Sequence, residues 1–145
     1  MLRDYGYSLK GTRLNGEVTA IKHNRTSVIG SARKIGQDTK LTSSWKVTGT
    51  TNGEVFETYV INILIPTLTK GQCVIMDNAK IHKTKNLKTL IEQAGCRLLY
   101  LPPYSPDLNP IEHLWSALKN NLRTLNSTKE NIQKNLDHCL INMCS

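Results

Sequence analysis

Residues 71–82 read Gly71-Gln-Cys-Val-Ile-Met-Asp-Asn-Ala-Lys-Ile-His82, and this stretch decides the fold. Its apolar run from Cys73 to Met76 is short and bounded by polar residues, which predicts a buried strand over residues 72–76. The strand delivers the carboxylate of Asp77 to its end. Because the chain has 11 acidic residues against 19 basic ones, a carboxylate in this position is a candidate ligand for a divalent metal.

A second carboxylate, Glu112, follows after 34 intervening residues. It lies in Leu101-Pro-Pro-Tyr-Ser-Pro-Asp-Leu-Asn-Pro-Ile-Glu-His-Leu-Trp115, where a proline-stiffened turn leads into a helix. Asn109 as N-cap and Pro110 at the first helical position predict a helix over residues 109–123. If the strand and this helix lie side by side, the two acids converge and offer the oxygen ligands that Mg²⁺ prefers. Alternatively, Asp77 is a turn residue and Glu112 an acid of a first helical turn.

The remaining elements follow from periodicity and turn residues. Short apolar runs before residue 52 predict antiparallel strands joined by turns at Asn15-Gly16, Gly36-Gln37 and Asn52-Gly53. Further helices are expected over residues 54–68, 84–94 and 128–143, and a further strand over residues 96–101. Ser127 and Glu130 have the spacing of a capping box for the last helix. This order of elements predicts an α/β fold with a mixed sheet flanked by helices.

Composition and charge restrict the partners. The length of 145 residues suits one domain, and a formal net charge of +8 favours a polyanion, with nucleic acid ahead of an anionic membrane surface. No apolar run reaches the roughly 20 residues of a spanning helix, and the N-terminal residues lack the layout of a signal peptide. We therefore expect a cytoplasmic, nucleoid-associated protein. The cysteines form no Cys-x-x-Cys pair, which disfavours structural zinc.

Two long motifs resemble a known family. Met76-Asp-Asn-Ala-Lys-Ile-His82 and Leu99-Tyr-Leu-Pro-Pro-Tyr-Ser-Pro-Asp-Leu-Asn-Pro-Ile-Glu-His-Leu-Trp-Ser-Ala-Leu-Lys119 resemble the catalytic domain of mariner-type insertion-sequence transposases, which are DDE superfamily endonucleases. The resemblance implies a ribonuclease H-like fold in which three carboxylates bind two Mg²⁺ or Mn²⁺ ions. Such a site cleaves DNA at element ends and joins the freed 3′-hydroxyl to target DNA. By matching motifs, Asp77 and Glu112 are the second and third catalytic, metal-binding acids.

The first acid of that family has no counterpart at the expected place. In the family it lies on a strand before the Tyr-Gly-Tyr-Ser segment, whereas only four residues precede Tyr5 here. We therefore expect residues 1–145 to be a partial catalytic domain that lacks its first strand and a separate DNA-binding domain, and that is inactive alone. A truncated copy and the downstream half of a frameshifted product both fit this pattern. Asp4 is the nearest acid, and a stand-alone nuclease requires it to complete the site.

Basic residues flank both acids and are candidates for holding DNA phosphates. The predicted DNA-binding residues are Lys80, His82, Lys83, Lys85, Lys119 and Arg123. Each lysine fits a solvated helix face equally well, and His82 also suits a role in supporting the site.

The expected partners are element-end and target DNA, together with a second copy or a full-length transposase. The alternative function is a non-catalytic DNA-binding or transposase-pairing fragment. A zinc hydrolase site built from Asp77, His82, Glu112 and His113 is the weakest alternative, because zinc needs three protein ligands with an open position.

Overall fold

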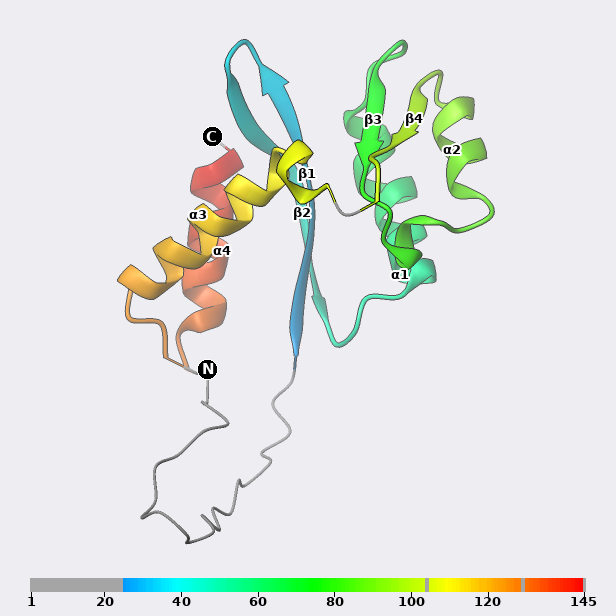
Figure 1. Cartoon of the computed structure of the whole chain (residues 1–145). Helices are drawn as coiled ribbons and strands as arrows, with labels where there is room; N and C mark the ends of the chain where they lie inside the picture. The colour runs from blue at the N-terminus through cyan, green and yellow to red at the C-terminus, as the bar shows by residue number, and fades with distance from the viewer. Residues whose placement is uncertain (1–24, 104, 129, 145) are drawn as a thin grey trace, which may run out of the picture.

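The computed structural model describes residues 25–103, 105–128 and 130–144. Within them the chain is a mixed α/β protein in which a long β-hairpin separates two groups of elements (Figure 1). Two C-terminal helices pack on one side of the hairpin, and a parallel strand pair with its helices lies on the other side. The hairpin is therefore the common support for both groups.

The hairpin consists of β1 (Thr26–Ile35) and β2 (Asp38–Thr48), which pair antiparallel. Its turn contains Gly36 with φ 65°, a conformation that glycine adopts without strain. The predicted turn at Gly36-Gln37 is thus confirmed, while the one at Asn15-Gly16 lies outside the described residues. The predicted strand turn at Asn52-Gly53 is wrong, because Asn52 is a helix N-cap whose Oδ1 accepts from the Val55 N–H at 2.9 Å.

A continuous helical segment follows, close to the range expected for a helix over residues 54–68. It comprises α1 (Gly53–Tyr59), a π-helical turn η1 (Val60–Leu64) and a 3₁₀ turn η2 (Ile65–Thr67). Its apolar side supplies Phe56, Tyr59, Val60 and Leu64 to a buried cluster. The sequence expectation of an amphipathic helix ending near Pro66 agrees with this arrangement.

Two short strands, β3 (Cys73–Met76) and β4 (Arg97–Tyr100), pair in parallel, and α2 (Leu87–Gln93) connects them. Gly95, with φ 77°, follows α2 as the expected stop. The prediction that the strand before Asp77 is buried is wrong for one of its faces, because β3 is covered by other residues on one face only. Ile75 and its register partner Leu99 are 56% and 57% exposed on the other face.

The predicted single mixed sheet is not what the described residues form. They contain two separate two-stranded sheets, β1 with β2 and β3 with β4. Local sequence patterns specify strands and their turns, whereas the joining of two sheets depends on which backbone edges meet in space. The α/β class of the prediction therefore holds, and among the described residues the strands form two small sheets in place of the one expected.

The C-terminal helices are α3 (Ile111–Thr124) and α4 (Ile132–Cys144). No side-chain hydrogen bond caps α3, so the predicted role of Asn109 as N-cap is wrong. The predicted capping box of Ser127 and Glu130 does not form at the start of α4. A different side-chain bond is found there, in which Oδ1 of Asn131 accepts from the Thr128 N–H at 2.6 Å. None of the helices in the described part of the chain is long and apolar enough to cross a membrane.

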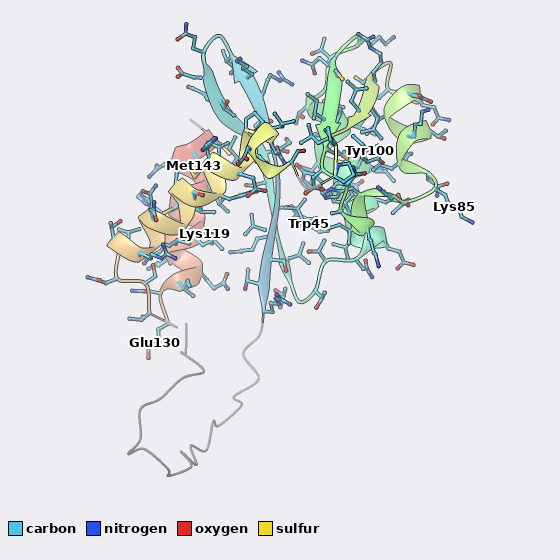
Figure 2. The ribbon with its side chains drawn as sticks, viewed as in Figure 1. Trp45, Lys85, Tyr100, Lys119, Glu130 and Met143 are labelled. Atoms are coloured by element: carbon cyan, nitrogen blue, oxygen red, sulfur yellow. The ribbon has the colours of Figure 1, made fainter. Side chains whose placement is uncertain are left out.

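Two buried clusters lie on opposite faces of the hairpin. Ile29 joins a cluster with α1, η1, β3 and α2, and Trp45 packs against it. Leu41 joins a second cluster with α3 and α4, against which Trp115 and Met143 pack. Figure 2 shows Trp45 and Met143 on the two sides of the hairpin. Because α3 and β3 pack on opposite faces of the hairpin, the hairpin fixes the position of one relative to the other.

Titration of the buried Tyr59 should make the stability of the fold depend on pH. Burial raises the pKa of Tyr59 above 10.0, although hydrogen bonds with Ser31 and Ser43 oppose the shift. The neutral phenol is favoured in the folded state, so its stabilising effect is complete below pH 10.0 and is lost as pH rises through the folded pKa. We expect Tyr59→Phe to flatten the decline of the unfolding free energy above about pH 10, measured by urea denaturation. An unchanged decline contradicts this assignment.

Candidate active site

Asp77 stands where the parallel strand pair ends, as the sequence pattern predicts. The Leu101 N–H donates to the carbonyl of Met76 at 2.8 Å, so the pairing continues up to the residue before the acid. The Asp77 side chain is 46% exposed. The strand pair thus holds the backbone of Asp77 while leaving its carboxylate open to solvent.

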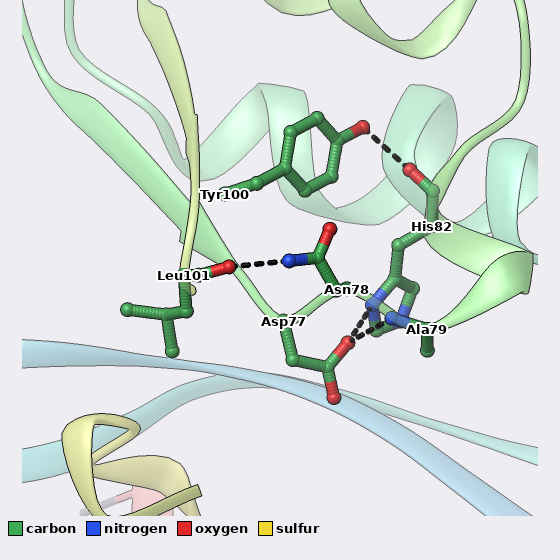
Figure 3. A network of polar contacts seen from close by, with 6 residues as sticks. All are labelled: Asp77, Asn78, Ala79, His82, Tyr100 and Leu101. Atoms are coloured by element: carbon green, nitrogen blue, oxygen red, sulfur yellow. Dashed lines mark hydrogen bonds and ion pairs between the residues drawn. The ribbon is translucent and has the colours of Figure 1, made fainter. Parts of the chain in front are cut away.

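Two donors from the following loop orient this carboxylate (Figure 3). Oδ1 of Asp77 accepts from the Ala79 N–H at 3.0 Å and lies 2.6 Å from Nδ1 of His82. With the carboxylate ionised, Nδ1 carries the hydrogen of this bond. Both bonds use the same oxygen, so Oδ2 has no hydrogen-bond partner among the described residues.

The residues around Asp77 are themselves fixed. The His82 ring packs on Phe56 of α1, with centroids 4.2 Å apart and planes inclined by 41°. Tyr100 Oη donates to the His82 carbonyl at 2.6 Å, and Nδ2 of Asn78 donates to the Leu101 carbonyl at 2.5 Å (Figure 3). Partial burial raises the pKa of Tyr100 above its ordinary value of 10.0, and its hydroxyl is a neutral donor at neutral pH. The loop after β3 is therefore tied to both α1 and β4.

Glu112 lies in the first turn of α3 and is exposed. Its carboxylate forms no ion pair within the described part of the chain. Asp77 and Glu112 both line a groove between β1, β3 and the start of α3, and both also line a smaller cavity beside Asn78 and Lys83. The fold therefore brings the two predicted acids to one place.

The carboxylate oxygens of Asp77 and Glu112 are suitable ligands for a hard divalent cation. A free carboxylate oxygen on Asp77 and the exposed carboxylate of Glu112 are the kind of ligand that Mg²⁺ combines with water. No cluster of three or more His, Cys, Asp or Glu side chains that could hold a metal is found in residues 25–103, 105–128 and 130–144. The alternative zinc set with His82 and His113 is thus not assembled there, and Asp4 lies outside the described residues.

The predicted DNA-binding side chains divide into two groups. Lys80, Lys83 and Lys85 are exposed after Asp77, and Lys83 lines the smaller cavity with both acids. Lys119 and Arg123 are exposed on α3, and Figure 2 shows Lys119 on this helix. At the rise of an α-helix, Lys119 lies about 10 Å along the axis from Glu112. The His82 side chain is 19% exposed and faces Asp77. Contact of these residues with DNA stays a prediction.

Three residues of the site were not identified from the sequence: Phe56, Asn78 and Tyr100. Asn78 carries a usable signal, because it directly follows the acid and belongs to the Met76–His82 motif. Phe56 and Tyr100 are 26 and 18 positions from His82, and no local pattern predicts their contacts with it. Such contacts become visible only in the folded chain.

Comparison with known proteins identifies relatives of the chain. A family model described as DDE superfamily endonuclease matches residues 1–133. The Tcb1 transposase of Caenorhabditis briggsae is 29% identical over 98 residues, which cover 65% of this chain and 36% of that protein. The Tc1 transposase of Caenorhabditis elegans is 34% identical over 68 residues, covering 47% of this chain and 25% of that protein. The chain thus matches only about a third or less of these relatives' lengths.

The contact between His82 and Asp77 should stabilise the fold as well as the site. His82→Ala removes the hydrogen bond to Oδ1 and the packing on Phe56, so we expect a loss of about 1–3 kcal/mol of unfolding free energy in urea denaturation. His138→Ala on α4 is the matched control, because His138 is exposed and its ring contacts only Asn142 among the hydrogen bonds described. Equal losses for both variants contradict the structural importance of the His82 contact.

Proposed function

This chain belongs to the DDE superfamily endonuclease family, and from that premise we propose that it is the part of a DNA transposase that carries the second and third catalytic acids. The observation that supports the proposal is the shared groove, which is lined by Asp77 from the end of β3 and by Glu112 from the first turn of α3. The hairpin followed by two parallel strands and a crossover helix also agrees with a ribonuclease H-like fold. We assign the chain to that fold.

Asp77 and Glu112 are the residues that would hold Mg²⁺ or Mn²⁺. When bound, two such ions activate the attacking water or hydroxyl and stabilise the leaving oxygen in phosphodiester chemistry. The chain's own contribution is to fix one carboxylate oxygen and leave the other free. Oδ1 of Asp77 is held by Ala79 and His82, so Oδ2 could bind a metal without breaking either hydrogen bond.

His82, Asn78 and Tyr100 act as positioning residues in this proposal. His82 bonds the acid, while Tyr100 and Asn78 tie the loop to β4 and its continuation. A metal-binding carboxylate must be held closely in place, because small displacements reduce catalysis strongly. This geometry favours a supporting role for His82 over direct DNA contact.

The exposed lysines provide the DNA-binding surface of the proposal. Lys80, Lys83 and Lys85 form no ion pair with the described residues, and Lys83 lies beside both acids. Cationic side chains next to a phosphodiester-cleaving site position the DNA backbone and make binding dependent on salt. Lys119 and Arg123 extend this surface along α3. DNA binding would also keep the protein at the nucleoid.

We propose further that the 145-residue chain alone does not cleave DNA, because two of the predicted catalytic carboxylates line the groove among the described residues and the family chemistry uses three. A second copy or a full-length transposase is the partner that would supply the remaining acid. The chain alone would then bind DNA without cutting it.

The proposal is tested by DNA binding and plasmid nicking on the same preparation. Fluorescence anisotropy with a labelled duplex should show binding that weakens as salt rises, and Lys83→Ala should reduce the log–log salt slope by about one. Lys134→Ala, an exposed lysine of α4, is the control and should leave the slope unchanged. Supercoiled plasmid should remain uncut in Mn²⁺.

Three outcomes decide between the alternatives. Absence of DNA binding at low salt contradicts the DNA-directed function. Robust nicking that Asp77→Ala abolishes contradicts the proposed inactivity but supports the catalytic site. If Asp4→Ala also abolishes that nicking, the chain is a stand-alone nuclease completed by Asp4.

A further inference from the structure

Asn109, just before α3, has a side-chain amide that does not perform the capping role predicted from the sequence. No side-chain hydrogen bond caps α3. The Asn109 carbonyl accepts from the Glu112 N–H at 3.1 Å, whereas the Asn109 side chain makes no hydrogen bond within residues 25–103, 105–128 and 130–144. The residue is partly buried. Its amide, with one acceptor oxygen and two donor hydrogens, is therefore available to a ligand.

Asn109 lies beside both acids of the candidate site. It lines the same groove as Asp77 and Glu112. The hydrogen bond between the Asn109 carbonyl and the Glu112 N–H closes a turn over these four residues. Such a turn brings its first and fourth Cα atoms within about 7 Å of each other. A side-chain oxygen of Asn109 can therefore reach a ligand that Glu112 also binds.

The backbone around Asn109 restricts where its side chain can lie. Pro110 fixes its own φ, which is −60° here, and limits the conformation of the residue before it. The preceding turn is also closed, because the Leu108 N–H donates to the Ser105 carbonyl at 3.2 Å. A group that is already ordered loses little conformational entropy when it binds a ligand. The Asn109 amide is thus preorganised by its backbone.

Other polar side chains close to the acids are used by the fold. Nδ2 of Asn78 donates to the Leu101 carbonyl at 2.5 Å (Figure 3). Oγ of Ser105 donates to the Pro103 carbonyl at 3.3 Å. Asn109 differs from both, because its side chain makes no such bond to the part of the chain that the structure describes.

The oxygen of an amide is a suitable ligand for the cation that the two acids attract. Mg²⁺ and Mn²⁺ take carboxylate, carbonyl and water oxygens, and water fills the positions that the protein leaves open. An amide oxygen can replace one of these waters without adding charge. It does not replace the third carboxylate of the family chemistry, so such a ligand is compatible with a chain that does not cleave DNA alone.

We propose that Oδ1 of Asn109 is a further ligand of the divalent cation held by Asp77 and Glu112. The inference rests on the proposed function, because it takes the shared site of the two acids as its starting point. Asp77 binds from the end of β3, and Asn109 and Glu112 bind from one turn at the start of α3. The cation then joins the strand pair to the helix through three side chains.

A Mn²⁺ titration of the full chain, followed by the electron paramagnetic resonance signal of free Mn²⁺, measures this contribution. Asn109→Ala should weaken Mn²⁺ binding about tenfold, because one protein ligand is lost. Asn109→Asp should tighten Mn²⁺ binding, because it keeps an oxygen at this position and adds a negative charge. Asn121→Ala changes an exposed amide on α3, so it is the matched control and should bind as the unchanged chain does.

Urea denaturation distinguishes a metal ligand from a structural residue. Without metal, Asn109→Ala should unfold with the same free energy as the unchanged chain, because the amide makes no hydrogen bond that the substitution could remove. With Mn²⁺ present, the variant should be stabilised less than the unchanged chain, because a ligand stabilises a fold according to its affinity. A loss of stability without metal and an unchanged effect of Mn²⁺ would show a structural role and overturn the proposal. Asn109→Asp carries the test if Asn109→Ala does not fold.

Asp77→Ala separates this proposal from the proposed function. If Asp77→Ala abolishes Mn²⁺ binding and Asn109→Ala leaves it unchanged, the role of Asn109 is overturned and the site of the two acids stands. If neither Asp77→Ala nor Glu112→Ala changes Mn²⁺ binding, the acid site itself is contradicted, and the role of Asn109 falls with it. Weaker DNA binding by Asn109→Ala with unchanged Mn²⁺ affinity would place the amide on DNA and also overturn the proposal.

Discussion

Parallel pairing between β3 and β4, from Cys73 opposite Arg97 to Met76 opposite Tyr100, positions most of the groups around the candidate site. Because Met76 and Tyr100 end their strands together, the segments that follow them start side by side. Asn78 on one segment bonds the backbone of Leu101 on the other, and Tyr100 reaches the carbonyl of His82. The acid at the strand end is thus held by backbone pairing first and by side-chain contacts second.

Glu112 is positioned at the same groove by α3, which packs in a different buried cluster from β3. The hairpin lies between these two clusters and contacts both. On one face, Tyr59 of α1 and Ser43 of β2 share a buried hydrogen bond of 2.8 Å. On the other, α3 approaches so closely that a Cβ added at Gly30 would lie 2.9 Å from the Trp115 ring. A side chain at Gly30 would force the Trp115 ring to shift, and Trp115 is one of the residues through which α3 packs on the hairpin. Glycine at this position therefore permits the close packing of the Trp115 ring on β1.

The elements that the sequence predicts well are those that depend on neighbouring residues. The strand before Asp77, the helix that carries Glu112 and the turn at Gly36 all have local signals, and the structure contains each of them. The separation of the two sheets, the change of cap at α4 and the contact of His82 with Phe56 have no such signal. They depend on segments that meet only after folding, where alternative hydrogen-bond partners compete.

A joint metal site at Asp77 and Glu112 is tested most directly by anomalous diffraction from crystals of the chain soaked in Mn²⁺. A peak within about 2 Å of carboxylate oxygens of both residues, absent in crystals of Asp77→Asn, is the predicted result. Asp107→Asn, which changes an exposed carboxylate of the η4 turn (Pro106–Leu108), should leave the peak in place. A peak that contacts neither acid, or that persists in Asp77→Asn, would contradict the shared site.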